Sequence, residues 1–510
     1  MNWLLPMPVI LPLFAAGFAL AMARRPKAQL AASVTTLTVV LGIAIALVAI
    51  THAQGPQVVN LGNWSAPVGI VLVADRLSAL MLVVSAVVLL GVLLYSVAQG
   101  LADGDEGAPV AIYHPTYLVL AAGVSNAFLT GDLFNLFVGF EMLLAASYVL
   151  LTLGGTGSRM RAGSIYVIVS LLSSMLFLIA IAMIYAATGT LNLAQLNVRL
   201  AEIDPNVSLV LQILLLLAFG IKAAVFPLSM WLPDSYPTAP APVTAVFAGL
   251  LTKVGVYAII RTQTLLFTDG RMDTILIVAA IVTMVVAILG AVAQDDIKRL
   301  LSFTLVSHIG YMVFGIALAN QLGLSASIFY VTHHITVQTA LFLVAGLIER
   351  RGGSTSLERL GSLTKAAPAL AILFFIPAMN LGGIPPMSGF LGKVGLVQAG
   401  IQHDSSLAYV AVGASLVTSL LTLYAVVKAW NKAFWQTAPQ PLPETDVPRS
   451  MFAPAAVIAS IGVLLAVVAG PLYAYTDAAA RDLRAQSPYV SAVLPDGERG
   501  EGISHQVEPE

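Results

Sequence analysis

The sequence predicts an all-α polytopic membrane protein with about 14 transmembrane helices. Hydrophobic residues make up 58% of its 510 residues, and the mean hydropathy is +0.91. Charged residues make up 10%, against about 25% in soluble domains, so a soluble fold could not cover this much apolar surface. Apolar runs of about 18–25 residues, the length that spans the hydrocarbon core of a bilayer, recur along the whole chain.

The first apolar run covers residues 2–23 and precedes Arg24, Arg25 and Lys27. A cleaved signal peptide has the opposite order of charged and apolar residues, so this run is expected to be the first membrane helix. Residues 51–76 are predicted to form an ordered extramembrane hairpin, and residues 475–510 a polar tail. Thirteen further runs are expected to span the membrane, at 29–50, 77–99, 113–130, 132–153, 163–187, 206–230, 240–267, 272–293, 299–320, 322–348, 366–401, 405–435 and 450–474.

The distribution of positive charge predicts the orientation of these helices. Of the 24 Lys and Arg residues, 14 fall in odd-numbered loops and 4 in even-numbered loops. Positively charged residues stay in the cytoplasm, so the odd loops are predicted to be cytoplasmic and both termini outside. The chain is therefore expected to be a multi-pass protein of the bacterial cell membrane, in contact with the lipid bilayer.

The composition also excludes several classes of function. A net charge of −1 argues against nucleic acid as a partner. The lack of cysteine excludes disulfides, thiolate zinc sites, iron–sulfur clusters and cysteine nucleophiles in this chain. We therefore expect no cofactor, no bound metal and no catalytic residue, and any redox chemistry would take place in a partner.

Several ionisable side chains lie inside the predicted helices. Each charge at a helix centre costs about 2.5–3.5 kcal/mol on insertion scales, so a chain that keeps several of them is expected to use them. One alternative is that they are structural clasps between helices, but three lysines against one carboxylate leave two lysines without a counter-charge. The set comprises Glu141, Lys222, Lys253, His308, His333, His334 and Lys393.

These residue types favour proton transfer. Burial disfavours the charged form of an amine, so one or two of the lysines are expected to accept and release protons. His333 and His334 are adjacent and must point to different faces of their helix, and we expect His334 to face the path. For His308, a structural hydrogen bond and a relay role both fit. Asp234 is expected either to cap a helix end or to line an entrance near Lys222.

Helix-breaking residues accompany two of the lysines. Helices 7 and 12 are predicted to be broken helices: Pro227 lacks a backbone donor and is predicted to kink the seventh helix next to Lys222. Unwound backbone at membrane depth is tolerated only where it is buried in protein or lines a wet cavity. The twelfth span has five breakers in its middle, of which the last lies about one turn before Lys393, namely Gly382, Gly383, Pro385, Pro386 and Gly389.

The placement of these lysines indicates an internal repeat. Helices 4–8, within residues 113–270, are predicted to form one unit, and helices 9–13, within residues 271–435, the next. Lys222 of the seventh helix then matches Lys393 of the twelfth. Five helices per unit would insert the second copy upside down, as in inverted-repeat transporters. Residues 1–112 supply helices 1–3 and the hairpin, and residues 436–510 the last helix and the tail.

Four motifs resemble those of the proton-conducting membrane transporter family, which includes the antiporter-like subunits of respiratory complex I and the large subunits of Mrp multisubunit sodium/proton antiporters. DLFNLFVGFE ends in Glu141, and DDIKRLLSFTLVSHIGYM contains His308. GIKAAVFPLSMWLPDSYPTAPAPVTAVFAGLLTKVG contains Lys222 and Lys253, and GGIPPMSGFLGKVGL contains Lys393. The resemblance covers nearly the whole chain and agrees with fourteen spans and both termini outside.

Within that family the chain most resembles the D-type Mrp subunit. Its length fits, because the A-type subunit is much longer, and THHITVQTALFLVAG also resembles the D-type form. One departure is Gln338, where members of the family often have a lysine. This departure shifts the expected proton-carrying role in the eleventh helix onto His333 and His334.

The resemblance implies a proton path near the middle of the bilayer. Glu141 would pair with Lys222, Lys253 would relay to the histidines of helices 10 and 11, and Lys393 would form the gate to the opposite face. Waters would bridge the gaps between helices. The transported ions would be H⁺ and Na⁺, the partners would be other Mrp subunits, and the sodium route would lie in another subunit or at an interface. The alternative is a proton-pumping membrane subunit of a respiratory NADH:quinone oxidoreductase.

Overall fold

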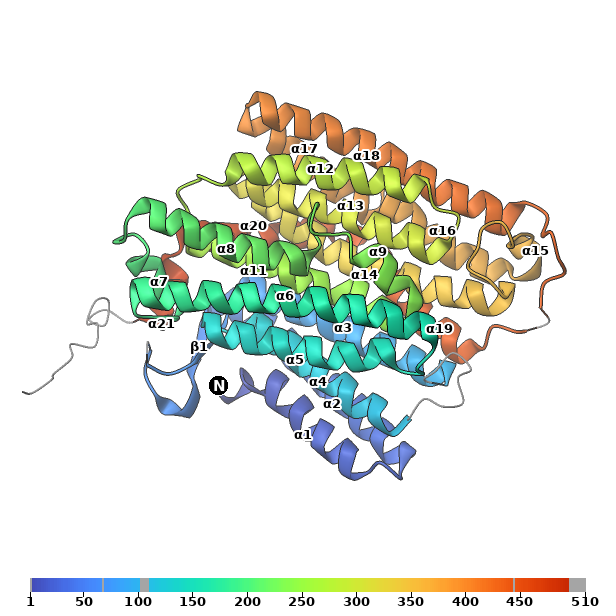
Figure 1. The fold of residues 1–510 in the computed structure, drawn as a ribbon, viewed down its shortest axis with the longest axis horizontal. Coiled ribbons are helices and arrows are strands. Elements are labelled where there is room, and N and C mark those ends of the chain that lie inside the picture. The colour runs from blue at the N-terminus through green and yellow to red at the C-terminus, as the bar shows by residue number, and fades with distance from the viewer. Residues whose placement is uncertain (1, 67, 101–109, 444, 495–510) are drawn as a thin grey trace, which may run out of the picture.

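The computed structural model describes residues 2–66, 68–100, 110–443 and 445–494, and it confirms an all-helical membrane protein apart from one small hairpin. Helices run roughly parallel to one another across the molecule (Figure 1). Among the described residues, eleven helices are long and apolar enough to cross a membrane. The helices are α1 (Met7–Ala21), α2 (Pro26–Gln54), α3 (Arg76–Gln99), α4 (Val110–Leu129), α5 (Leu133–Thr152), α6 (Gly157–Thr188), α7 (Leu193–Arg199), α8 (Pro205–Ala223), α9 (Leu232–Ser235), α10 (Ala241–Val246), α11 (Thr252–Leu265), α12 (Asp273–Val292), α13 (Ile297–Ala317), α14 (Gln321–Gly352), α15 (Leu363–Ala366), α16 (Pro368–Gly382), α17 (Ser388–His403), α18 (Ser406–Trp430), α19 (Arg449–Val467), α20 (Ala469–Ala485) and α21 (Ser487–Val493).

All eleven of these membrane-spanning candidates coincide with predicted spans. At two of the other three expected positions lie α1, which has only 15 residues, and α4. The third, 366–401, is occupied by two shorter helices, α16 and α17. The count of fourteen, the boundaries of the two repeats and the outside location of the termini therefore stay predictions.

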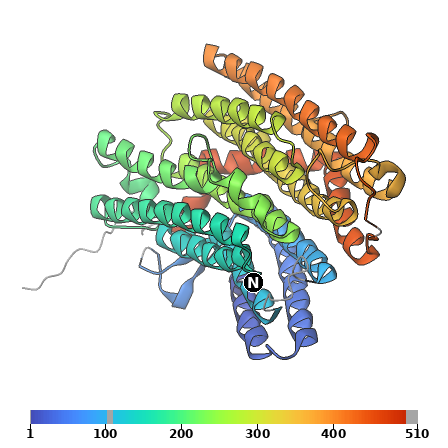
Figure 2. The same ribbon diagram turned by 45° about the vertical axis from the view of Figure 1, so that its right-hand side comes forward.

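The arrangement of the helices leaves α13 and α14 in the interior of the bundle. The most apolar stretch of α14 is wholly buried, and that of α13 nearly so, whereas α2 and α19 are mostly exposed along theirs. In Figure 2, α1 and α2 project from one side of the bundle as a helical hairpin, with α4 packed against α1. This central pair carries His308, His333, His334 and Gln338, all of which are buried.

The seventh span differs from the prediction of a kink at Pro227. Helix α8 ends at Ala223, and Ala224 takes a left-handed conformation with φ of 60°. The chain then continues through a turn into the short helix α9 and the 3-10 turn η3 (Tyr236–Thr238). Because no backbone donor is available at Pro227, the helix ends before it rather than bending through it, and Lys222 lies in the last turn.

The predicted hairpin in residues 51–76 is present. Strand β1 (Gln57–Asn60) pairs antiparallel with β2 (Val71–Ala74), with Gln57 opposite Ala74. All four residues of β2 are buried, while β1 is partly exposed. The hairpin leads directly into α3, whose first turn is capped by the Asp75 side chain.

The prediction of a polar tail from residue 475 was wrong for its described part. Helix α20 continues to Ala485, and α21 follows it to Val493. One face of α20 is apolar and packs on α14, α3 and α11, and α21 buries Tyr489 and Val490. The amphipathic period of this segment is hidden from an inspection of composition, because its charged residues and its alanines and leucines average out along the helix. Residues 495–510 lie outside the described residues.

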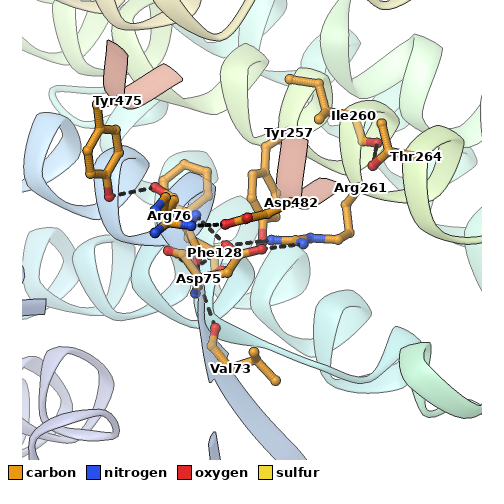
Figure 3. Close-up of polar contacts among 11 residues, drawn as sticks. Val73, Asp75, Arg76, Phe128, Tyr257, Ile260, Arg261, Thr264, Tyr475 and Asp482 are labelled. Atoms are coloured by element: carbon orange, nitrogen blue, oxygen red, sulfur yellow. Dashed lines mark hydrogen bonds and ion pairs between the residues drawn. The ribbon is translucent and has the colours of Figure 1, made fainter. Parts of the chain in front are cut away.

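Two ion pairs join α3 to the helices around it (Figure 3). Arg261 of α11 contacts Asp75 through both terminal nitrogens, at 2.6 and 2.9 Å. The next residue, Arg76, pairs with Asp482 of α20. In the count of charges along the sequence, Arg261 is among the four residues assigned to even-numbered loops. In the structure it is buried, with only 3% of the residue exposed. Its position near the end of a span looks peripheral in the sequence, and only the packing of α3 and α20 over it makes it buried.

The Asp75–Arg261 pair belongs to a buried polar network that also includes Ser78 and Tyr257. Burial alone would raise the pKa of Asp75, but the charge and hydrogen bonds of Arg261 and the hydrogen bonds from Ser78 hold it below the ordinary value of 3.8. A lowered carboxyl pKa stabilises the folded state above the unfolded pKa, and this contribution is lost only as the pH falls through the folded value. The pair is therefore intact throughout the physiological pH range. The Tyr257 hydroxyl accepts from Arg261 at 3.2 Å and donates to the Phe128 carbonyl at 2.8 Å.

Replacing Asp75 with asparagine is expected to destabilise the protein by about 3–5 kcal/mol, because it leaves the Arg261 guanidinium buried without a counter-charge. The measurement is the thermal unfolding midpoint of the purified protein. The double variant Asp75→Asn/Arg261→Met removes both charges and should recover a large part of the loss. A single variant as stable as the wild type, or a double variant no better than the single, would contradict this assignment.

Candidate functional site

Lys222 and Glu141 are joined through a serine hydroxyl that the sequence analysis did not identify. Lys222 Nζ donates to Ser174 Oγ at 3.2 Å, and Ser174 Oγ donates in turn to Glu141 Oε1. The ammonium also lies 4.8 Å from the centre of the Phe140 ring, a favourable position for a cation. The expected pair is therefore present as a bridged one, with α6 supplying the bridge between α5 and α8.

A small cavity lies beside the Lys222 side chain. Its volume is about 20 Å³, which is room for about one water molecule. Ser170 and Ser173 of α6 and Trp231 and Tyr236 from the segment after α8 contribute to its walls. Helix α11 packs closely behind it, since a Cβ added at Gly255 would lie 2.7 Å from the Ala223 nitrogen. The end of α8 and the middle of α11 thus come together at this cavity.

Lys253 follows a π-helical turn, η4 (Phe247–Leu251), that joins α10 to α11. The lysine is fully buried, and its Nζ donates to the Ala248 carbonyl at 2.5 Å. The adjacent Thr252 hydroxyl is buried and has no partner among the described residues. Single π-helical turns are frequent at functional sites. The sequence does not predict this turn, because a π-helical turn differs from an α-helical turn only in that each hydrogen bond spans one residue more.

Two histidines meet at the contact between α13 and α14. The rings of His308 and His334 lie 5.1 Å apart, centre to centre. His308 is held on both sides, by the Tyr330 hydroxyl at 2.8 Å and the Thr422 hydroxyl at 3.4 Å. Both ring nitrogens of His334 are buried and have no partner among the described residues. The π-helical turn that precedes Lys253 packs against α14, the helix that carries His334.

His333 points to a different side of α14 from His334, as adjacent helical residues must. Its Nδ1 lies 2.9 Å from the Ser388 hydroxyl, which also donates to the Gly462 carbonyl at 3.0 Å. His333 therefore faces the start of α17. Gln338, one turn beyond His334, donates to the Leu301 carbonyl at 2.8 Å, and its own carbonyl oxygen is buried without a partner in the described structure.

Lys393 is bound to backbone oxygens at the predicted break in the twelfth span. Its Nζ donates to the carbonyls of Leu381 and Gly382 at 3.1 and 3.2 Å, and to Ser419 Oγ at 2.9 Å. These carbonyls are available because α16 ends at Gly382, where Gly383 adopts a positive φ of 84°, and the last carbonyls of a helix lack partners within it. Pro385 and Pro386 lie in the gap before α17 begins.

Asp234 lies at the surface rather than beside Lys222. It forms an ion pair with Arg299 at 2.8 Å, and more than half of its side chain is exposed. Both residues border a surface pocket of about 260 Å³. Asp234 therefore lies at the mouth of a cavity, while its interaction with Arg299 also fits the alternative interfacial role.

The chain matches a family model described as "NADH:quinone oxidoreductase/Mrp antiporter, TM" over residues 130–422. It is 38% identical to the D-type subunit of the Na(+)/H(+) antiporter of Alkalihalophilus pseudofirmus, over 97% of this chain and 100% of that protein. It is 36% identical to the protein of the same name from Bacillus subtilis, with the same coverage.

Solved structures give the same result. A chain of the Mrp complex from Dietzia sp. superposes with a TM-score of 0.91 at 33% identity, covering 97% of this chain and 100% of that one. A chain of the membrane-bound sulfane sulfur reductase, an archaeal respiratory membrane complex, gives 0.88 at 26% identity, covering 96% and 99%. The chain belongs to the NADH:quinone oxidoreductase/Mrp antiporter family, in the group of D-type Mrp antiporter subunits.

Proposed function

We propose that this chain is the proton-carrying subunit of a multisubunit Na⁺/H⁺ antiporter of the cell membrane, where it assembles with other Mrp subunits. Two observations support the assembly and the ions. The curated relatives are named as Na⁺/H⁺ antiporter subunits, and a solved structure with the same fold is a chain of an Mrp complex. The sodium route lies in another subunit or at an interface with one, so the part of this chain is to carry protons.

The observation that carries the proposal is how the buried amino groups are held. Lys222 donates to a hydroxyl, Lys253 to a backbone carbonyl, and Lys393 to two carbonyls and a hydroxyl. These direct acceptors are neutral oxygens, so Lys253 and Lys393 can lose a proton without leaving an unpaired negative charge beside them, and Lys222 contacts the Glu141 carboxylate only through Ser174. A clasp between helices would pair each lysine with a carboxylate, as Arg261 is paired with Asp75.

The histidine pair supplies the middle of this path. His334 has two buried nitrogens without partners among the described residues, so it can take a proton from the Lys253 side and release it toward His308. Isolated unsatisfied polar groups are rare in folded proteins and usually mark an ordered water or a functional group. Further unpartnered oxygens on Thr252, Gln338 and Thr418 are suitable anchors for the waters that would join these side chains.

Replacing Lys222 with alanine is expected to abolish proton exchange, because the path loses the amine nearest to Glu141. The measurement uses everted vesicles from cells that lack their own sodium/proton antiporters and express the whole locus. A pH-sensitive dye then reports the collapse of the pH gradient after a sodium pulse. Lys27→Ala, which changes an exposed lysine, is the control and should leave the response unchanged.

The same vesicles distinguish the respiratory alternative. If the assembly were a redox-driven pump, sodium would have no effect, while NADH would drive acidification that Lys222→Ala abolishes. A sodium response that persists in Lys222→Ala would instead support a structural role for this lysine.

Replacing Ser174 with alanine is expected to slow exchange by about tenfold, the rate effect of one hydrogen bond of ordinary strength. The reason is that Ser174 alone bridges Lys222 to Glu141 in the described structure. The neighbouring Ser173 gives a matched control, since its hydroxyl donates to the Ala218 carbonyl at 2.9 Å. Equal rates for Ser174→Ala and Ser173→Ala, measured over a range of pH, would show that the bridge has no part in transport.

A further inference from the structure

The segment from Trp231 to Thr238 forms a thin wall between two cavities. On one side lies the small cavity beside Lys222, to which Trp231 and Tyr236 contribute. On the other side lies the surface pocket of about 260 Å³, bordered by Pro233, Asp234, Pro237 and Thr238 of the same segment. Alternate parts of one short stretch of chain therefore face the interior and the surface.

Two hydroxyl groups in this wall are buried without partners. Ser235 and Tyr236 are both 0% exposed, and neither the Ser235 Oγ nor the Tyr236 hydroxyl has a hydrogen-bond partner among the described residues. Leaving a buried hydroxyl unsatisfied costs about 1–3 kcal/mol. Two adjacent buried hydroxyls without protein partners, in a wall with a cavity on each side, indicate that water molecules bind there.

The position of the Tyr236 ring is well determined. It packs against the rings of Trp231 and Phe247 at 5.6 and 5.7 Å. Its backbone carbonyl accepts from the Thr244 hydroxyl at 2.7 Å. The ring is therefore fixed on both sides, and the hydroxyl is the free end of a rigid side chain that lines the Lys222 cavity.

We propose that the Tyr236 hydroxyl, with Ser235, is the proton gate between the surface pocket and Lys222. In each transfer, a hydrated proton (H₃O⁺) on the pocket side gives its proton to a hydroxyl oxygen and is left as water, while that hydroxyl releases its own proton to the water beside Lys222. The amine then takes up this proton, and the hydroxyl ends as it began. The inference rests on the proposed function, because it identifies the residue through which Lys222 exchanges protons with one face of the membrane.

The pocket is lined by residues of the odd-numbered loops and of the helix ends beside them. Its other walls come from residues around the start of α13 and the end of α14, including Lys298 and Glu349, which pair at 2.5 Å. These loops are the ones rich in Lys and Arg, which are predicted to be cytoplasmic. The gate would thus serve the cytoplasmic side alone.

The first test replaces Tyr236 with phenylalanine, which keeps the ring and removes the hydroxyl. Sodium-driven proton exchange by the whole complex in everted vesicles is expected to fall about tenfold, the effect of one lost hydrogen bond. Tyr117→Phe is the matched control. Tyr117 is also buried, its hydroxyl donates to the Leu89 carbonyl at 2.8 Å, and it borders neither of the two cavities. Wild-type exchange in Tyr236→Phe, with normal assembly of the complex, would overturn the proposal.

The second test measures water access and does not depend on antiport. The chain has no cysteine, so Ser235→Cys introduces its one thiol, and silver ions in chloride-free buffer are the probe. The thiols left after silver treatment are counted with a fluorescent maleimide after denaturation, and the complex with the unchanged chain gives the background from partner subunits. We expect silver to block Ser235→Cys in everted vesicles about tenfold faster than in right-side-out vesicles.

Ser96→Cys is the control for the silver experiment. Ser96 is equally buried, lies near the end of α3 on the predicted cytoplasmic side and is hydrogen-bonded to Tyr113, so it should react slowly from either face. Equal blocking of Ser235→Cys from both faces, or none from either, would overturn the gate. If sodium drives no exchange even in the unmodified complex while Ser235→Cys is still blocked from one face, the proposed antiport fails and the water connection stands.

Discussion

The cost of holding amino groups away from water is the constraint on which the interior of this protein depends. Three lysines lie among apolar helices, and each must find oxygens to accept its hydrogen bonds. Lys393 finds them where α16 ends, and Lys253 at the carbonyl of Ala248 in a π-helical turn. Lys222 lies in the last turn of α8 and bonds a serine of the neighbouring helix. Irregular backbone and buried lysine therefore occur together, because regular helices keep their carbonyls occupied.

The buried Arg261, unlike the buried lysines, is paired directly with a carboxylate. Arg261 and Asp75 are joined by two short hydrogen bonds. Arg76, which follows Asp75 in the chain, is paired with Asp482. A guanidinium stays charged and suits a fixed, two-pronged contact with a carboxylate. These pairs tie α3 to α11 and α20 at one end of the bundle. The lysines, in contrast, are left with neutral partners, which keeps both of their protonation states accessible.

The sequence was most informative about features that depend on local composition and on helix-breaking residues. It located the eleven membrane-spanning candidates, the hairpin and the gap between α16 and α17. It predicted the break of the seventh span at Pro227 but as a kink rather than as the helix end that is present, and in the tail it missed α20, which covers the bundle. Both failures have the same reason, since the alternatives differ in tertiary packing and not in local propensity. The roles assigned to the buried residues in transport remain predictions.

The sequence by itself determined which groups must be buried, because a lysine in the middle of a span of about 20 apolar residues lies within the hydrocarbon core of the bilayer, away from water. Only the tertiary structure decided how those groups are connected. Ser174 between Lys222 and Glu141, Tyr330 beside His308, and the unpartnered hydroxyl of Tyr236 carry no signal in the sequence. Serine and tyrosine are ordinary residues of membrane helices, and they become part of a polar path only when helices far apart in the chain pack together.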